Sequence, residues 1–252
     1  MNKSLVFIDS GIGGLSTLSS TILNLKHNII YFADNKFAPY GNLSKKQIME
    51  RIKAIVLTLK NKFKPLGFVI ACNTATTSSI KDIRSQFKPD IFIGTEPAIK
   101  LSKKLGFYKP LVIATPQTIK QIKYSKQIDA LPLKHLAKSI ETFAITKSVF
   151  SQYNLLKDIF YIKSKSNRND CLVLGCTHYV IIKPIIKKYI DIPIIDGNEG
   201  VAREIGHKFL ALTNNQQVKP SIKFIFSNDS KGLNENYKKI LGQILANQIN
   251  LC

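Results

Sequence analysis

The chain has 252 residues, of which 44% are hydrophobic and 21% are charged, and its net charge is +21. This composition is that of a folded protein of one large or two small domains, and it excludes collagen, coiled coil and wholesale disorder. No apolar run reaches the roughly 18 to 20 residues of a membrane span, and the N-terminus lacks the apolar region of a signal peptide. We therefore expect a soluble, cytoplasmic protein without a membrane partner.

The positive charge by itself favours a nucleic-acid or anionic-membrane partner. However, 33 of the 37 basic residues are lysines and only 4 are arginines, and arginine is the residue preferred for bidentate recognition of phosphates and bases. The bias towards Lys, Ile and Asn is typical of an AT-rich genome. We expect solvated surface lysines and no specific nucleic-acid partner, and a polyanion-binding protein stays as the distant alternative.

Short β-branched runs alternate with longer amphipathic segments along almost the whole chain, which predicts βαβ units and a largely parallel sheet. Ser44 is a suitable N-cap for a helix that extends to Phe63, because apolar residues such as Ile48 and Ile52 recur there at helical spacing. The expected strands are Leu5–Ile8, Ile29–Ala33, Gly67–Ala71, Ile91–Gly94, Leu111–Ala114, Leu172–Gly175, Pro193–Ile195 and Ile222–Phe226.

Two segments of the chain, 68–74 and 172–178, share one pattern. In each, a buried strand is followed by a small residue, then by a cysteine (Cys72 or Cys176), and then by polar residues that begin a helix. Two similar halves would place both cysteines at the carboxyl ends of parallel strands, where open α/β sheets build their sites.

A cysteine in this context lies near unpaired backbone N–H groups at a helix N-terminus, which lowers its pKa below about 8.5 and makes it a base or a nucleophile. The alternative for any single cysteine is a small buried hydrophobic residue. Its occurrence at both Cys72 and Cys176 favours the functional interpretation.

The remaining cysteines have simpler interpretations. Four cysteines are too few for a disulfide framework, so free thiols are expected. A zinc site built from Cys171, Cys176 and His178 is excluded, because Cys171 and Cys176 lie roughly 16 Å apart along an extended strand at about 3.3 Å per residue. We expect Cys171 to be a core thiol and Cys252 a loose terminal one.

The first turn, Asp9–Gly14, follows a strand as a phosphate-binding loop would. Its glycines do not fit the nucleotide fingerprints, since Ser16 stands where the third glycine is required, and Asp9 would repel phosphate. Asp9 instead tunes a nearby thiol or receives an ammonium group, unless it is an ordinary helix N-cap.

A series of motifs extends from the N-terminal part of the chain to about residue 200. They are Phe7-Ile8-Asp9-Ser10-Gly11-Ile12-Gly13-Gly14, Tyr31-Phe32-Ala33-Asp34, Pro39-Tyr40-Gly41, Ala71-Cys72-Asn73-Thr74-Ala75, Glu96-Pro97-Ala98, Ala114-Thr115-Pro116-Gln117-Thr118 and Leu174-Gly175-Cys176-Thr177-His178-Tyr179. With these motifs, which occur in family order, the sequence resembles the glutamate racemases. The Cys-Thr-His-Tyr form is similar to glutamate racemases in particular, since aspartate racemases usually have an acidic residue in place of His178.

The resemblance implies inversion of glutamate at Cα without a cofactor or metal, which supplies D-glutamate for peptidoglycan. It gives Cys72 the role of the base that acts on D-glutamate and Cys176 that of the base that acts on L-glutamate. Asp9 would assist the first thiol, and His178, steadied by Glu141, the second. The positions that match substrate-binding residues are Ser10, Pro39, Tyr40, Gly41, Asn73, Thr74, Thr115, Thr118 and Thr177.

Alternatives remain for some of these residues. Thr115 and Thr118 are also compatible with an ordinary strand end and helix N-cap. Where the family often has Cys-Pro-Leu, this chain has Leu131-Pro132-Leu133 followed by Lys134-His135, so the resemblance supports the role of Glu141 less firmly.

From these observations we expect an α/β protein of two similar domains, each with a largely parallel central sheet flanked by helices. The first comprises 1–95 and 205–252, the second comprises 96–204, and the active site lies in the cleft between them. The resemblance further implies a homodimer. The near alternative is a racemase for aspartate or another amino acid, and the distant one is a polyanion- or gyrase-binding protein.

Overall fold

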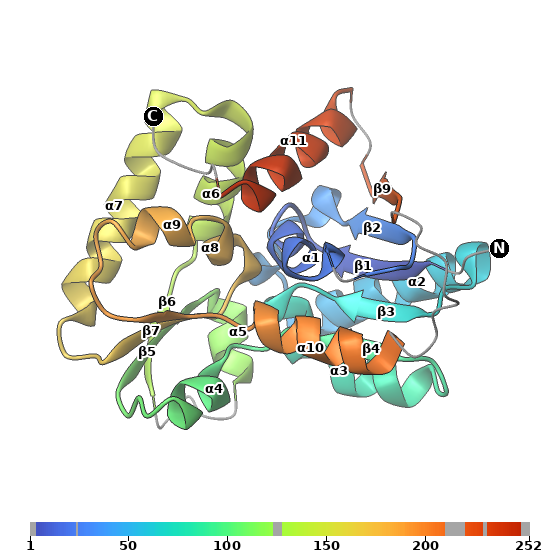
Figure 1. Ribbon diagram of the computed structural model, residues 1–252, viewed down its shortest axis with the longest axis horizontal. Coiled ribbons are helices and arrows are strands. Elements are labelled where there is room, and N and C mark those ends of the chain that lie inside the picture. The colour runs from blue at the N-terminus through green and yellow to red at the C-terminus, as the bar shows by residue number, and fades with distance from the viewer. Residues whose placement is uncertain (1–3, 24, 123–127, 210–219, 229–230, 248–252) are drawn as a thin grey trace.

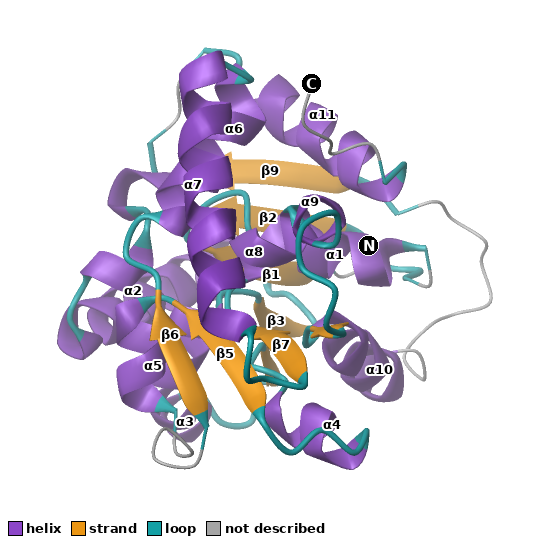
Figure 2. Ribbon diagram, turned by 90° about the vertical axis from the view of Figure 1, so that its left-hand side faces the viewer, coloured by secondary structure: helices purple, strands orange, loops and turns teal. Residues whose placement is uncertain are grey.

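The computed structural model describes residues 4–23, 25–122, 128–209, 220–228 and 231–247. Within these residues the chain forms two separate sheets, one of five strands and one of four, and every strand pairing in them is parallel. Figures 1 and 2 show the two sheets side by side, with helices around them. The predicted α/β fold class is confirmed.

The five-stranded sheet contains β1 (Leu5–Asp9), β2 (Ile29–Ala33), β3 (Gly67–Ile70), β4 (Phe92–Gly94) and β9 (Ile222–Phe226), in the order β4-β3-β1-β2-β9. Its helices are α1 (Gly14–Ile22), α2 (Lys45–Phe63), α3 (Asn73–Gln86), α10 (Asn198–Phe209) and α11 (Leu233–Leu245). We call this sheet with its helices the first lobe.

Alternation along β1 divides the core of the first lobe into two layers. Val6 and Ile8 pack in an apolar cluster with α2 and α3, whereas Leu5 and Phe7 pack in a second cluster with α1, α10 and α11. The two sets lie on opposite faces because successive strand residues point to opposite sides of a sheet. Helix α2 begins where the sequence predicts, since the Ser44 hydroxyl accepts from the backbone N–H of Gln47 in a capping box.

The four-stranded sheet contains β5 (Pro110–Ala114), β6 (Asp129–Pro132), β7 (Cys171–Leu174) and β8 (Ile194–Ile195), in the order β6-β5-β7-β8. Its helices are α4 (Ile99–Lys104), α5 (Pro116–Gln121), α6 (Leu136–Thr146), α7 (Val149–Ser166), α8 (Thr177–Ile181) and α9 (Lys183–Ile186). This is the second lobe. The apolar cluster that contains Leu5 and Phe7 continues into α6, α7, α8 and α9, so the two lobes share one core.

All eight expected strands are present, each within one residue of its predicted ends. The strand that the sequence analysis missed is β6. Its residues alternate weakly and are half-buried or exposed because β6 is the edge of its sheet. Part of β6, Leu131-Pro132, also belongs to the segment where the sequence departs from the family motif.

The buried cysteines are as expected in two respects. Cys72, Cys171 and Cys176 are free thiols, and Cys171 is a fully buried core residue of β7. Cys252 lies outside the described residues. None of the helices described is long and apolar enough to cross a bilayer.

Candidate active site

Cys72 and Cys176 occupy equivalent places in the two lobes. Cys72 is the N-cap of α3, two residues after the end of β3, and Cys176 is the N-cap of α8, two residues after the end of β7. Each is 6% exposed. The duplicated strand-cysteine-helix pattern that the sequence predicts is therefore present in the structure.

The Cys72 thiol lies among groups of the first lobe. The Ser10 hydroxyl is 3.9 Å from Cys72 Sγ. Burial, together with the negative charge of Asp9, raises the pKa of this thiol, and a hydrogen bond with the Ala75 backbone opposes the rise. The expectation of a lowered pKa is therefore wrong for Cys72, because in this closed site desolvation outweighs the helix N-terminus.

Cys176 begins a chain of polar contacts in the second lobe. Its Sγ lies 4.0 Å from His178 Nδ1, and His178 Nε2 lies 3.0 Å from Glu141 Oε2. Burial disfavours the charged imidazole, but the hydrogen bonds with Cys176 and Glu141 outweigh it and raise the pKa of His178 well above its usual value. His178 lies between the thiol and the carboxylate, and these two contacts favour its protonated form.

Asp9 lies where the two lobes meet. Its Oδ1 accepts from the Gly11 backbone N–H at 2.8 Å, and its Oδ2 accepts from the Thr177 hydroxyl of the second lobe at 3.3 Å. Burial raises the pKa of Asp9, while the positive charge of His178 lowers it. Asp9 is therefore close to both halves of the site, and the sequence suggested only its proximity to the first.

Three threonine hydroxyls from both lobes meet beside Cys72. Thr74 Oγ1 lies 2.9 Å from Thr115 Oγ1 and 2.9 Å from Thr118 Oγ1, and the last two are 3.0 Å apart. Thr115 is indeed also the N-cap of α5, accepting from the Thr118 backbone N–H. We call these three residues the hydroxyl triangle, and it is an arrangement that can donate hydrogen bonds to an anion.

The other expected binding residues surround these groups. Asn73 is the first residue of α3, and Tyr40 and Gly41 lie in the single-turn helix η2 (Tyr40–Asn42), which Pro39 precedes. Tyr40 and Asn73 are both buried. Gly41 packs directly on Thr115, because a Cβ at this glycine would lie 2.7 Å from the Thr115 Cβ.

The segment that departs from the family motif is packed against α8. The Tyr179 hydroxyl donates to the Leu133 carbonyl at 3.2 Å, and the Leu133 N–H donates to the Ala114 carbonyl at 2.8 Å. Leu136 and Ile140 are buried in the shared core, so Glu141 is held on a fixed helix face.

Sequence reasoning missed an ion pair of the first lobe between the buried Asp34 and the partly buried Arg51; Asp34 is also bonded to Tyr40. The sequence feature that could have indicated this ion pair is an arginine in a lysine-rich chain. Among the described residues no group of three His, Cys, Asp or Glu side chains is arranged to hold a metal ion.

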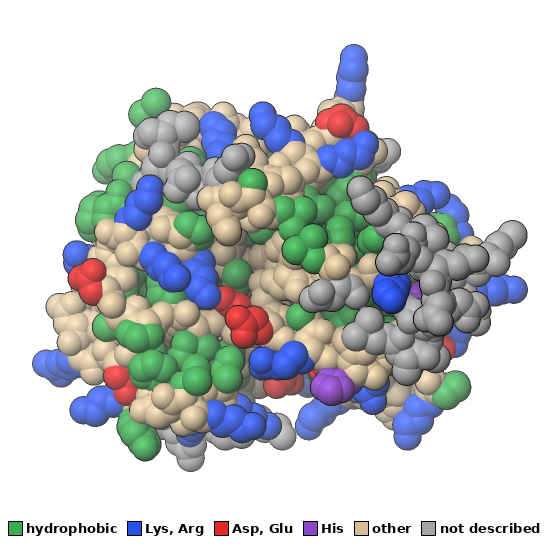
Figure 3. All heavy atoms as spheres, in the orientation of Figure 1, with side chains coloured by type: hydrophobic (Ala, Val, Ile, Leu, Met, Phe, Trp, Pro, Cys, Tyr) green, Lys and Arg blue, Asp and Glu red, His purple; other side chains and the backbone are tan. Residues whose placement is uncertain are grey.

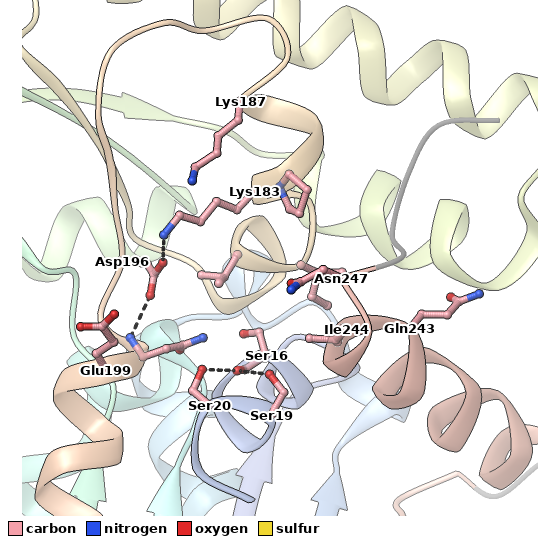
Figure 4. Close-up of a pocket in the computed structure, with 14 residues that line it drawn as sticks. Ser16, Ser19, Ser20, Lys183, Lys187, Asp196, Glu199, Gln243, Ile244 and Asn247 are labelled. Carbon is pink, nitrogen blue, oxygen red and sulfur yellow. Dashed lines mark hydrogen bonds and ion pairs between the residues drawn. The ribbon is translucent and has the colours of Figure 1, made fainter. Parts of the chain in front are cut away.

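A cavity of about 530 Å³ lies elsewhere, between the C-terminal end of α11 and helices α1, α8, α9 and α10 (Figure 4). Its walls include Ser16, Lys183 and Asp196, and the last two form an ion pair. Neither cysteine lines it, so the cavity is separate from the thiols. Both thiols are almost closed off from solvent.

The contact of Gly13 with α8 leads to a prediction about stability. A Cβ at Gly13 would lie 2.6 Å from Thr177 Oγ1 and would also overlap His178. We expect Gly13→Ala to destabilise the fold by about 1–3 kcal/mol through overpacking. The measurement is the free energy of unfolding in urea, with Gly200→Ala in α10 as the control, because nothing lies within 4 Å of a Cβ there. Equal stabilities for the two variants would contradict the close packing of α1 on α8.

No model of a protein family matches the sequence. A curated relative does match: the glutamate racemase of Clostridium botulinum (strain Alaska E43 / Type E3) is 37% identical over 257 aligned residues, which cover 95% of this chain and 97% of that protein. The chain belongs to the glutamate racemase family.

Solved structures of glutamate racemases agree in fold. The Escherichia coli enzyme, in complex with L-glutamate and an activator, has a TM-score of 0.82 at 25% identity, covering 97% of this chain and 96% of that one. The Francisella tularensis enzyme, in complex with D-glutamate, has a TM-score of 0.78 at 25% identity, with 96% and 94% covered. The two-lobed architecture is thus shared across nearly the whole length of this family member.

Proposed function

We propose that this protein interconverts L- and D-glutamate by transferring protons at Cα between two thiols. The observation that carries the proposal is the pair of cysteines, one from each lobe, at equivalent strand ends of a glutamate racemase fold. Inversion needs one group that removes a proton from one face of Cα and another that donates a proton to the opposite face. Two thiols of similar chemistry supply that symmetry, and no cofactor is needed for it.

The first base is Cys72, acting on D-glutamate. Its thiol must lose its proton before it can accept one from Cα, and the buried Asp9 carboxylate, whose own pKa is raised, is suited to receive that proton. The Ser10 hydroxyl can donate to the thiolate when it forms.

The second base is Cys176, acting on L-glutamate. Protonated His178 stabilises its thiolate through a hydrogen bond, and Glu141 balances the imidazolium and fixes the ring orientation. After one thiolate has removed the Cα proton, the opposite thiol donates its own. The two cysteines thereby exchange protonation states in each turnover.

The remaining polar groups of the site would hold the substrate. We assign the hydroxyl triangle and the Tyr40-Gly41 turn to one carboxylate, because hydroxyls and backbone N–H groups can surround an anion there. The residues assigned to the ammonium group and the other carboxylate are Ser10, Asn73 and Thr177, together with Asp9 for the ammonium charge. Pro39 precedes Tyr40 as the N-cap of η2 and would fix the backbone direction there.

The proposal extends to the setting of the reaction. D-Glutamate made by this protein would serve peptidoglycan synthesis in the cytoplasm, and the active form would be a homodimer. The domains would comprise 1–95 with 205–252, and 96–204, a boundary that falls inside α10 (Asn198–Phe209), which packs with the first lobe. The pairing of β9 with β2 supports the return of the C-terminal part to the first domain.

Incubation in deuterium oxide without added cofactor tests this function. We expect L-glutamate and D-glutamate to racemise and to acquire deuterium at Cα, because the thiols exchange their protons with solvent between turnovers. Circular dichroism and proton NMR measure the two changes. Exchange with L-aspartate and not with L-glutamate would make the protein an aspartate racemase, and no exchange with any L-amino acid would refute the proposal.

A polyanion-binding role has less support from the surface. Figure 3 shows Lys and Arg side chains spread over the displayed face instead of gathered in one stripe. Such spread charges are typical of a solvated surface. Salt-dependent DNA binding that persists after loss of both cysteines would favour this alternative.

A further inference from the structure

The ion pair between Asp34 and Arg51 in the first lobe lies outside the groups assigned so far. Asp34, directly after β2, is fully buried, and Arg51 reaches it from α2. Arg51 Nε donates to Asp34 Oδ2 at 2.8 Å, and Arg51 Nη2 donates to Oδ1 at 2.6 Å. Two parallel bonds of this kind fix the guanidinium and the carboxylate in one relative orientation.

The same ion pair holds the segment 35–43 at two points. The Arg51 guanidinium lies over the Phe37 ring, 3.7 Å from its centroid, and Phe37 ends the single-turn helix η1 (Asn35–Phe37). The Tyr40 hydroxyl donates to Asp34 Oδ2 at 2.5 Å. Both turns of the segment are therefore tied to one rigid group.

The held segment reaches across to the second lobe. Gly41 follows Tyr40 directly and packs on Thr115, which belongs to the hydroxyl triangle. A continuous set of contacts thus runs from Arg51 through Asp34 and Tyr40 to Gly41 and Thr115. The contacts of Arg51 described here are with Asp34 and Phe37, so its influence on the triangle passes through the segment.

The residue type at position 51 is informative. In this chain 33 of the 37 basic residues are lysines, yet position 51 is an arginine. Its planar guanidinium fork donates two parallel hydrogen bonds to the Asp34 carboxylate. Lysine has no such fork and could not bond both carboxylate oxygens in this geometry while stacking on Phe37. The contacts at position 51 therefore require the planar guanidinium of arginine as well as its positive charge.

We propose that Asp34 and Arg51 are positioning residues that hold the Tyr40-Gly41 turn against Thr115 and so preform the carboxylate-binding end of the site. This inference rests on the proposed function. Both enantiomers of glutamate present the same carboxylates, so loosening this end weakens binding of both and leaves proton transfer largely unchanged. The effect on KM separates these residues from the groups that assist one thiol.

Arg51→Lys tests the proposal because it keeps the charge and removes the fork. We expect KM to rise about tenfold for both L- and D-glutamate, the size expected for loss of one charge-assisted hydrogen bond, with kcat changed by less than about threefold. The control is Lys60→Gln on the same helix, which breaks the partly buried ion pair with Asp90 far from segment 35–43. An unchanged KM in Arg51→Lys, or an equal rise in Lys60→Gln, would overturn the proposal.

Hydrogen exchange gives a readout that does not depend on activity. In Arg51→Lys we expect the backbone amides of 35–43 to exchange several-fold faster, while those of α3 keep their wild-type rates. In Lys60→Gln both sets should exchange as in the wild type. If the wild type itself does not racemise glutamate, the proposed function fails, while faster exchange confined to 35–43 still supports the positioning role. Unchanged exchange there refutes that role.

Discussion

Alanine in place of Cys72 or of Cys176 is expected to abolish racemisation in both directions and to leave the fold intact. Each thiol is the proton donor or acceptor on one face of Cα, so neither direction can be completed when one is missing. Both side chains are small, so truncation to alanine removes a single sulfur atom and little packing. Serine should be almost as inactive, because a hydroxyl hardly ionises near neutral pH.

The matched control is Cys171→Ala. Cys171 is also a buried free thiol, on β7, the strand that leads to Cys176, but it packs in a separate apolar cluster with Val112 and Val173. We expect this variant to lose some stability and to keep its activity. Racemisation followed by circular dichroism decides the matter. Activity of about a tenth of the wild type in either Cys72→Ala or Cys176→Ala, a barrier change of only about 1.4 kcal/mol, would refute the two-thiol mechanism.

Asp9→Asn and His178→Asn are expected to slow opposite directions of the reaction. In the proposed mechanism Asp9 accepts the proton of Cys72 before D-glutamate reacts, and His178 stabilises the thiolate of Cys176 before L-glutamate reacts. Asp9→Asn should therefore lower mainly the kcat from D to L, and His178→Asn mainly that from L to D. A general acid-base helper worth roughly 10²-fold corresponds to about 2.7 kcal/mol of barrier.

The equilibrium constant between the enantiomers is unaffected by any variant, so an asymmetric kcat must be accompanied by compensating changes in KM. Measurement of kcat and KM in both directions shows whether this holds. Asn73 provides the comparison, because as a substrate-binding residue its loss should weaken both directions alike. Equal proportional losses of kcat in Asp9→Asn and His178→Asn would mean that these residues shape the pocket as a whole. The hydrogen bond of Asp9 with Thr177 makes this outcome a meaningful alternative.

The parts of the fold that could be predicted are those encoded locally. Buried parallel strands appear as short β-branched runs, and Ser44 with Gln47 marks the start of α2, so these elements follow from neighbouring residues alone. The similarity between segments 68–74 and 172–178 could also be recognised in the sequence, because in both a small residue follows the strand and precedes the cysteine. Strand β6 could not, because an edge strand lies partly in solvent and needs no apolar alternation.

The features of the site that the sequence could not reveal depend on contacts between distant residues. The raised pKa of Cys72 results from burial and from the negative charge of Asp9, whereas the local helix N-terminus predicts the opposite direction. The pairing of Arg51 with Asp34 joins residues 17 positions apart on different elements. An arginine in a lysine-rich chain indicated its importance but not its partner.

Strand β9 has a consequence for how the chain folds during synthesis. Its pairing with β2 joins residues 193 positions apart, for instance Ile29 with Ile222, and almost the whole second lobe is encoded between them. On the ribosome β1 to β4 and the four-stranded sheet can each form from contiguous chain, while the fifth strand of the larger sheet, β9, is added last. Until then the edge of β2 is unpaired and open to contact with other chains. Chain termination before residue 222 would therefore leave an aggregation-prone first lobe beside a complete second sheet.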